Sequence, residues 1–202
     1  MSATEGEEYT RRLIHKSGLA WKRLLDVQAP YRWNLRRHDL GVTLDVGCGV
    51  GRILASLPAG SVGVDHNITS VAVARGQGLD ALTVQQWSEV ASQRAQSFDS
   101  ILIAHVIEHL IRDDARELVG QYLPALRPGG KVLFICPQER GFASDPTHVS
   151  WTTGADLEEL ARTCGLIPRP WRSFPFPRWT GRWFTYNEFT LLAWKPAGHV
   201  HP

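Results

Sequence analysis

The sequence predicts an α/β protein whose sheet is largely parallel and is covered by helices on both faces. Between residues 42 and 136, short apolar segments typical of buried strands alternate with helical segments. Residues 98–104, FDSILIA, are almost continuously apolar, as expected of a strand that is covered on both faces. With 202 residues, 43% hydrophobic and 21% charged, the chain is long enough for one globular domain with a substantial core.

The expected elements follow in chain order. Residues 7–38 are predicted to be helical, with an interruption at Pro30. Strands are predicted at 42–46, 61–65, 81–87, 98–104 and 131–136, and helices at 50–57, 68–75, 113–126 and 155–164. The run Pro128-Gly129-Gly130 is a strong helix breaker and is expected to end the third of these helices.

The last third of the chain changes character. Residues 166–173 and 186–194 are predicted to be two strands, and the segment between them is too short for a long helix. Antiparallel strands need only a short connection, so the two are expected to pair as a hairpin at one edge of the sheet.

A glycine-rich turn follows the first strand, in the run Asp45-Val-Gly47-Cys48-Gly49-Val-Gly51. Side chains larger than that of glycine would keep a ligand away from the backbone, and a helix after the turn would offer free N–H groups. Open α/β sheets bind ligands at the carboxyl ends of their strands. The turn is therefore predicted to bind a ligand through Gly47, Cys48, Gly49 and Gly51.

A second acid supports this site. Asp65 ends the second strand, where a carboxylate can accept hydrogen bonds from both hydroxyls of a ribose. The alternative is an Asp that caps the following helix. Together, the turn and the acid predict a ligand that contains adenosine.

The spacing of the glycines distinguishes between adenosine ligands. A dinucleotide-binding G-x-G-x-x-G would place its third glycine at position 52, but that residue is Arg52 and the glycine is Gly51. This disfavours a nucleotide-dependent oxidoreductase. The run D-x-G-x-G-x-G resembles the first motif of class I S-adenosylmethionine-dependent methyltransferases. In that family the leading acid, here Asp45, helps to hold the methionine end of the cofactor.

The resemblance extends over residues 42–166. Phe98-Asp99 and the run AHVIEHL at 104–110 are similar to the family's fourth-strand segment, and LRPGGK at 126–131 to the motif before its fifth strand. The run DPTHV at 145–149 is similar to the small-molecule branch that includes ubiquinone-biosynthesis methyltransferases. The resemblance implies a Rossmann-like, doubly wound sheet of seven strands, the last antiparallel between the fifth and sixth. It also implies S-adenosyl-L-methionine as cofactor and transfer of a methyl group (EC 2.1.1).

The adenine contacts are less well defined. Many relatives carry an acid after the third strand, whereas this chain has Gln85-Gln86-Trp87-Ser88-Glu89. Gln86 and Trp87 are the candidates to contact adenine, and Trp87 in the core is an equal alternative. His66, directly after Asp65, completes the predicted cofactor contacts, together with His105 near the methyl-donating region.

Two histidines are candidates for proton removal from an oxygen acceptor, since histidine titrates near neutral pH. His148 is preferred because the loop that starts at Asp145 is expected to leave the fifth strand toward the cleft; the alternative role is a hydrogen bond that fixes the loop. His105 is second. The run His105-Val-Ile-Glu108-His109 formally matches a zinc-peptidase signature, H-x-x-E-H. It directly follows a buried strand, so no metal site is predicted.

The predicted acceptor is a small molecule, anionic or amphiphilic, and nucleic acid is not expected. Basic residues outnumber acids in 11–38 and 162–195, while signatures of nucleic-acid base methylation are missing. Cys136, before Pro137, is expected to be buried rather than nucleophilic. The segment 169–184 mixes aromatic residues with Arg and Pro, as expected of a lid, a partner surface, a contact with lipid or a contact with nucleic acid. An RNA methyltransferase and a non-catalytic binding protein of this fold remain alternatives.

One domain is expected over residues 1–202. Its parts are a helical segment at 1–40 that covers the active site, a cofactor-binding core at 41–137, and a substrate-side loop, helix and hairpin at 138–202. Three cysteines without close pairing, a polar amino terminus and the lack of a long apolar run predict a cytoplasmic protein without a transmembrane segment. The oligomeric state is left open.

Overall fold

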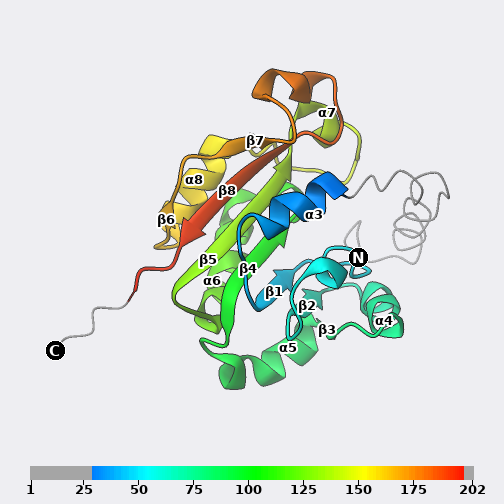
Figure 1. Cartoon of the computed structure of the whole chain (residues 1–202), viewed down its shortest axis with the longest axis vertical. Helices are drawn as coiled ribbons and strands as arrows, with labels where there is room; N and C mark the ends of the chain where they lie inside the picture. Colours follow the sequence, from blue (N-terminus) through cyan, green and yellow to red (C-terminus); the bar gives the residue numbers. More distant parts are fainter. Residues whose placement is uncertain (1–28, 198–202) are drawn as a thin grey trace. The chain divides into compact units, whose positions relative to one another are not determined.

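The computed structural model describes residues 29–197, and the chain forms two compact units, residues 1–90 and 91–202 (Figure 1). The helices predicted before residue 29 lie outside the described residues. The first described element is the helix α3, Ala29–Arg36. Pro30 is its second residue, in the first turn, where the missing N–H group would have no partner in the helix.

The first unit contains three parallel strands in the order β3-β2-β1: β1 Thr43–Val46, β2 Val62–Asp65 and β3 Ala81–Thr83. Every residue of β1 and β2 is buried, as the apolar runs predict. The helix α4, Ile68–Gly76, begins after Asn67, whose side chain accepts a hydrogen bond from the N–H of Ser70 at 3.1 Å.

Two predictions for this unit are wrong. The helix expected at 50–57 is only a 3-10 turn, η1, Leu54–Ser56. Gly47, Gly49 and Gly51 all have positive φ, so the irregular turn uses the residues that would have begun a helix. The strand expected at 81–87 ends at Thr83 and passes into a helix, α5, Val84–Val90.

The second unit contains the strands β4 Phe98–Ala104, β5 Leu126–Pro137, β6 Ile167–Pro168, β7 Arg172–Phe174 and β8 Glu188–Trp194. Their order is β4-β5-β8-β6, with β7 also paired to β8. β4 and β5 are parallel, and β8 is antiparallel to β5 and β6. The antiparallel last strand, between the fifth and sixth, is thus confirmed. The described residues contain eight strands rather than seven because the predicted strand 166–173 is divided into β6 and β7.

The helical elements of this unit are η2 Ala91–Arg94, η3 Ile107–His109, α6 Arg112–Tyr122, η4 Leu123–Ala125, α7 Glu139–Phe142, α8 Gly154–Thr163 and η5 Arg178–Arg182. We expected Pro128-Gly129-Gly130 to end a helix, and this prediction is wrong. The run lies within β5, where the register with β4 shifts. Among residues 29–197, no helix is long and apolar enough to cross a bilayer.

The register of β5 and β8 creates a polar edge in the second unit. Glu188, the first residue of β8, pairs with Pro137, the last residue of β5. His105 follows the last residue of β4 and donates its N–H to the carbonyl of Ile135 at 2.9 Å. The carboxyl ends of β4 and β5 therefore bring His105 and Glu188 together, although they are far apart in the sequence.

Candidate active site

Asp45 supplies a buried carboxylate on β1 that is suited to a positively charged ligand group. Its side chain is 1% exposed, and Oδ2 has no hydrogen-bond partner. Burial, with a smaller contribution from the charge of Asp65, raises the pKa of Asp45 to about 7. A buried carboxylate oxygen without a hydrogen-bond partner destabilises the folded protein unless a ligand group bonds to it. The ammonium of the methionine end of S-adenosylmethionine would do so.

The glycine turn is held by backbone hydrogen bonds to the end of β2. The N–H groups of Gly47 and Cys48 both donate to the carbonyl of Val64, at 2.8 and 3.1 Å. The N–H of Gly49 donates to Oδ2 of Asp65 at 2.8 Å. Gly47 and Gly49 have φ of 78° and 54°, which glycine adopts without strain. The turn is thus fixed next to both acids.

Two members of the predicted site have packing roles. A Cβ on Gly51 would lie 2.4 Å from the side chain of Leu79 and 3.1 Å from that of Ala74, so Gly51 is required by its neighbours in the core. The side chain of Cys48 is buried in a cluster with Leu54 and Ala74. Burial, followed by the charges of Asp45 and Asp65, raises the pKa of the Cys48 thiol above its usual range. The Cys48 thiol therefore packs in the core, and a contact between Cys48 and a ligand stays a prediction.

Asp65 is not the N-cap of α4, which is Asn67, and its contact with ribose hydroxyls stays a prediction. Besides the N–H of Gly49, its carboxylate accepts the N–H of Asn67 at 2.8 Å and so fixes the start of α4. A carboxylate can accept about four hydrogen bonds, so capacity for ribose hydroxyls remains. The Nδ1 atom of His66 lies 3.6 Å from Oδ1 of Asp65, and its side chain is 44% exposed.

The two residues predicted to contact adenine lie on α5. Oε1 of Gln86 accepts hydrogen bonds from the N–H of Thr83 at 3.0 Å and from Arg75 at 2.7 Å. These contacts fix the junction between β3 and α5. Trp87 is 1% exposed, so its ring belongs to the core of the first unit, the alternative that the sequence left open. Adenine contacts by these residues stay a prediction.

In the second unit, His105 lies between two buried glutamates. Its Nε2 is 2.9 Å from Oε1 of Glu188, and its Nδ1 is 3.3 Å from Oε1 of Glu108. Its φ is +58°, a conformation that is uncommon outside glycine and is held here by the bond to Ile135. Burial alone would lower the pKa of His105, but the charges and hydrogen bonds of Glu188 and Glu108 outweigh it and raise the pKa to about 10. His105 is thus an imidazolium at neutral pH.

His148 and His109 contact carbonyl oxygens instead of carboxylates. Nδ1 of His148 lies 2.8 Å from the carbonyl oxygen of Phe142, and Nδ1 of His109 lies 3.1 Å from that of Thr147. A carbonyl oxygen can only accept, so each Nδ1 carries a proton, and in a neutral ring Nε2 is then the nitrogen that can accept one. The burial of His109 lowers its pKa. The two rings meet edge to face at 4.8 Å.

This histidine pair lies near Glu108. The ligand-type atoms of Glu108, His109 and His148 lie within 4.8 Å of one another, a spacing that a metal ion could also use. The N–H groups of Val149 and Ser150 donate to the main-chain carbonyl of Glu108 and hold the 145–150 loop on η3. The alternative role of His148, a hydrogen bond that fixes the loop, is present in its contact with Phe142, and a role in proton transfer stays a prediction.

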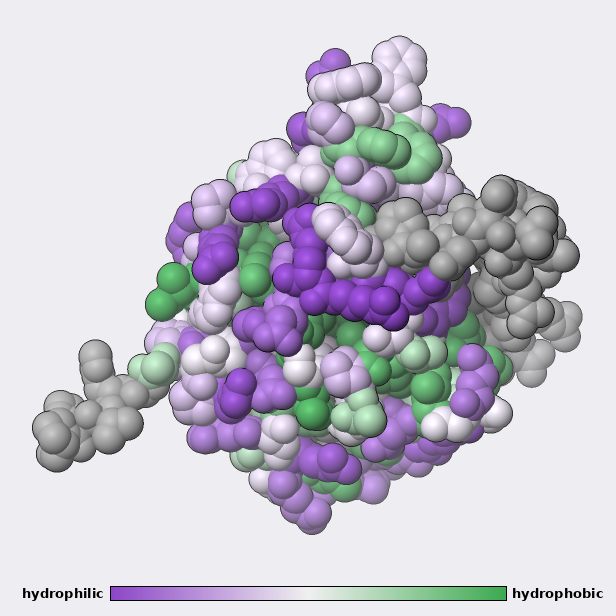
Figure 2. Space-filling view, in the orientation of Figure 1, coloured by the Kyte–Doolittle hydropathy of each residue, from purple (hydrophilic) through white to green (hydrophobic). Residues whose placement is uncertain are grey.

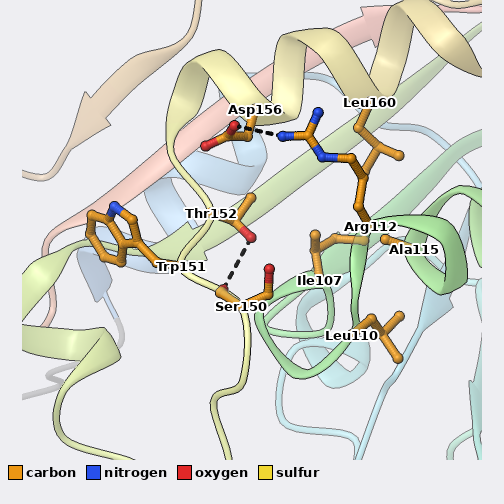
Figure 3. Close-up of a pocket in the computed structure, with 9 residues that line it drawn as sticks. All are labelled: Ile107, Leu110, Arg112, Ala115, Ser150, Trp151, Thr152, Asp156 and Leu160. Carbon is orange, nitrogen blue, oxygen red and sulfur yellow. Dashed lines mark hydrogen bonds and ion pairs between the residues drawn. The ribbon is translucent and has the colours of Figure 1, made fainter.

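A small pocket of about 60 Å³ lies beside this cluster, between η3, the start of α6, α8 and residues 150–152 (Figure 3). Arg112 and Asp156 form an ion pair of 3.3 Å across one side, and Ile107, Leu110 and Leu160 supply apolar surface.

Sequence reasoning missed Glu188 and gave Glu108 no role in the site. Glu188 lies in a segment predicted only as an edge strand, and nothing in the local pattern links it to His105. The signal that could have found it is a lone acid opening an otherwise apolar strand. Cys136 is fully buried, as predicted, and burial followed by the charge of Glu108 raises its thiol pKa well above the usual value.

Comparison with known proteins connects these features to a family. A family model described as a methyltransferase domain matches residues 44–132. A ubiquinone biosynthesis O-methyltransferase from Xanthomonas axonopodis pv. citri is 32% identical, over 64% of this chain and 67% of that protein. The protein of the same name from Xanthomonas oryzae pv. oryzae is 26% identical, with the same coverage.

Solved structures agree on the fold. A SAM-dependent methyltransferase from Archaeoglobus fulgidus superposes with a TM-score of 0.64 at 18% identity, covering 82% of this chain and 93% of that one. The magnesium protoporphyrin IX methyltransferase from Synechocystis with bound SAM gives 0.62 at 15% identity, covering 95% and 93%. The chain therefore belongs to the class I S-adenosylmethionine-dependent methyltransferases, with a Rossmann-like α/β fold and S-adenosylmethionine as its methyl donor.

Proposed function

We propose that this enzyme transfers the methyl group to a hydroxyl oxygen of a small molecule and that Nε2 of His148 accepts the hydroxyl proton. The observation that carries the proposal is the hydrogen bond from Nδ1 of His148 to the carbonyl of Phe142, which in the neutral ring leaves Nε2 as the nitrogen that can accept a proton. The relatives' printed name, O-methyltransferase, supports oxygen as the acceptor atom.

His105, our second candidate, does not suit the role of base. Both of its ring nitrogens face carboxylates, and its pKa of about 10 keeps it protonated at neutral pH. A group that already carries its proton cannot accept another. We propose that His105 instead orders Glu108 and Glu188 at the carboxyl edge of β4 and β5.

The acceptor hydroxyl should be weakly acidic. A neutral imidazole removes a proton efficiently when the pKa of the hydroxyl is not far above that of the imidazolium. A phenol, with a pKa near 10, therefore suits it better than an aliphatic alcohol. The anionic acceptor that we expected from the basic flanks has less support. Protonated His105 with Glu108 and Glu188 carries a net charge of −1, and residues 11–28 lie outside the described structure.

The cofactor supplies a methyl group on a positively charged sulfur. In the first unit, Asp45, the backbone of Gly47 to Gly49 and Asp65 are the proposed binding residues. The acceptor oxygen gives its proton to His148 and forms the bond to the methyl carbon as the carbon–sulfur bond breaks. Most of the rate enhancement should come from holding acceptor and donor in line.

Three free cysteines, two of them buried, support the proposed cytoplasmic location.

The proposal is tested with S-adenosylmethionine labelled in its methyl group and four acceptor sets: phenols and catechols, aliphatic alcohols, carboxylic acids, and total cell RNA. Phenols should be labelled fastest. His148→Gln should lower kcat by about 10²–10⁴ while the dissociation constant for the cofactor stays unchanged. His109→Gln is the matched control, because it removes the neighbouring ring and should lower kcat less.

Other outcomes would contradict the proposal. Labelling of RNA without labelling of small molecules would identify an RNA methyltransferase. Tight cofactor binding with no transfer to any acceptor set would favour the non-catalytic alternative. Equal activity of His148→Gln and wild type on phenols would remove His148 from the mechanism and leave the methyltransferase assignment intact.

A further inference from the structure

An aromatic lobe, residues 174–187, connects β7 to β8 and includes η5. Five of the eleven exposed large hydrophobic residues in the described chain lie within this short stretch: Phe176, Trp179, Trp183, Phe184 and Tyr186. Trp179 and Trp183 are 69% and 78% exposed. In Figure 1 the lobe projects beyond the end of the strands of its unit, beside α7, and the same part of the molecule protrudes at the top of Figure 2. Large rings with this exposure are not part of the core and suggest a contact surface.

The lobe is anchored to the sheet, so its rings are exposed in a defined arrangement. The side-chain amide of buried Asn187 donates to Oε1 of Gln138 and to Oγ of Ser173, both at 2.9 Å. Arg178 forms a two-pronged ion pair with Glu139, at 2.5 and 2.8 Å. Gly181 packs so closely on Gln138 that a Cβ would lie 2.0 Å from Oε1. These contacts hold η5 on β5 and α7.

Three of the five exposed rings contact each other. Phe176 and Phe184 pack edge to face at 5.3 Å, and Phe184 and Tyr186 at 5.6 Å. Phe176, Phe184 and Tyr186 thus form one aromatic cluster, in the same short stretch as the exposed Trp179 and Trp183.

Arginines are the only charged residues of the lobe. Residues 174–187 contain Arg178 and Arg182 and no acid, although Glu188 follows directly, and the apolar side chains are all aromatic or proline. Arg178 is bound to Glu139, while Arg172, Arg182 and Arg140 of α7 are exposed. The charge of the neighbouring acid, Glu139, is neutralised by its ion pair with Arg178. A surface of Trp, Tyr and Arg without acids is complementary to an anionic layer.

We propose that the aromatic lobe docks on the surface of a lipid bilayer that contains anionic headgroups. Trp and Tyr rings favour the level of the headgroups, where an apolar ring and a polar edge are both satisfied, and arginines bind lipid phosphates. A yielding lipid surface accommodates a small projecting lobe. A stable protein interface needs about 800 Å² on each partner, usually on a broader patch. The proposal is independent of the identity of the methyl acceptor.

The experiment is co-flotation of the full chain with vesicles of phosphatidylcholine, with or without phosphatidylglycerol, at low and high salt. We expect binding to the anionic vesicles, weakened by salt. The double variant Trp179→Ser, Trp183→Ser should lower binding by about tenfold or more, because it removes two rings from the contact. Arg172→Gln with Arg182→Gln should abolish the preference for anionic vesicles.

Trp33→Ser is the matched control. Trp33 is also exposed, at 58%, and has Arg37 over its ring at 5.1 Å, but it lies on α3. It should bind vesicles like wild type. Unchanged melting temperature and cofactor affinity show that the lobe variants are folded.

Three results would overturn the proposal. These are no co-flotation with anionic vesicles, binding that survives loss of both tryptophans, and equal loss of binding in Trp33→Ser. Binding of single-stranded RNA by the lobe, with no binding to vesicles, would reassign the surface to nucleic acid. Self-association that disappears in the Trp179, Trp183 variant, again without vesicle binding, would reassign it to an interface between copies.

Discussion

Individual charged residues differ in protonation because their neighbours differ. Asp45 is buried with another acid as its charged neighbour, so its pKa rises to about 7. His105 has two acids against its ring, so its pKa rises to about 10. Nδ1 of His148 bonds to a carbonyl oxygen, so Nε2 is the nitrogen that can accept a proton in the neutral ring. The first suits a cationic ligand group, the second is a fixed cation and the third can accept a proton.

Cofactor affinity should depend on pH through Asp45. The ammonium of the cofactor binds the carboxylate form, so protons and cofactor compete. With a pKa of about 7 in the free protein, the dissociation constant should fall about eightfold between pH 6 and 7.5. Asp45→Asn should weaken binding about tenfold to hundredfold at pH 7.5 and remove the pH dependence. Titration calorimetry measures both.

Asp80→Asn is the matched control, because Asp80 is an exposed acid of the same unit. It should keep the pH dependence of wild type. If Asp45→Asn shows the wild-type slope, another group, such as His66, is responsible and the assignment to Asp45 is wrong.

Stability at alkaline pH should depend on the His105–Glu188 pair. A histidine whose pKa is raised on folding stabilises the protein fully below its unfolded pKa of about 6.5. That contribution is lost as pH rises through about 10. The His105 side chain is 41% exposed, so solvent screening reduces the effect to about 1 kcal/mol. Glu188→Gln should therefore melt about 2–4 °C below wild type at pH 7, and the difference should shrink by pH 10.5.

The comparison with Glu188→Gln also removes a second alkaline effect. The buried thiols of Cys48 and Cys136 have raised pKa values, so the folded state of either protein loses stability as unfolded thiols ionise. This loss is common to both and cancels in the difference. A gap between the two proteins that stays constant from pH 7 to pH 10.5 would show that the pair does not titrate as described.

The secondary-structure elements owe their ends to local chemistry. The helix α8 begins with a reciprocal capping box, in which Thr153 and Asp156 each bond to the other's backbone. α4 begins at Asn67, and η1 is short because the glycine turn precedes it and Pro58 follows it. η5 is anchored by tertiary contacts rather than by a cap. Its position should therefore be sensitive to packing substitutions.

A pair of glycine substitutions tests this difference. Gly181→Ala should destabilise the protein by about 1–3 kcal/mol, because its Cβ would lie 2.0 Å from Oε1 and 2.6 Å from Cβ of buried Gln138. Gly120→Ala, in α6, meets nothing within 4 Å. It should stabilise the protein by about 0.5–1 kcal/mol, since alanine is the better helix former. Urea unfolding measures both; equal effects would mean that η5 is not held against Gln138.

The chain as a whole separates its two chemical tasks between two compact units. The proposed cofactor residues Asp45, Gly49 and Asp65 all belong to residues 1–90. The candidate acid–base groups, His105, His148 and the two glutamates, belong to residues 91–202. Each unit has its own parallel strands and its own buried residues. Binding of a ligand should therefore be detected in the unit whose residues contact that ligand.

Saturating cofactor should stabilise the protein by mass action. At a concentration of 100 times the dissociation constant, the gain is about 2.7 kcal/mol, or a rise in melting temperature of about 5–10 °C. Slower hydrogen exchange should concentrate at residues 45–51 and 65–67. NADH at the same concentration should give no shift. Protection of the second unit alone, or an equal response to NADH, would contradict the location or the identity of the cofactor site.

The sequence by itself determined the α/β class, the antiparallel last strand and the cofactor. Alternating apolar segments report which backbone stretches are buried, and this depends on local spacing rather than on the final fold. The glycines and acids of the Asp45 motif could likewise be recognised, because the residues that form the turn lie within a few positions of one another in the sequence. The same local signals failed at 50–57 and 81–87, where positive φ values and the Gln86–Thr83 contact redirect the chain.

The tertiary structure decided the protonation states and the packing roles. Whether His105 is a base depends on Glu188, which the antiparallel pairing of β5 and β8 brings to it from a distant part of the chain. Gly51 and Trp87 look like ligand contacts in the motif but are required by the core. Electrostatics and packing act through space, so no pattern of neighbouring residues could reveal which charge lies 2.9 Å from His105.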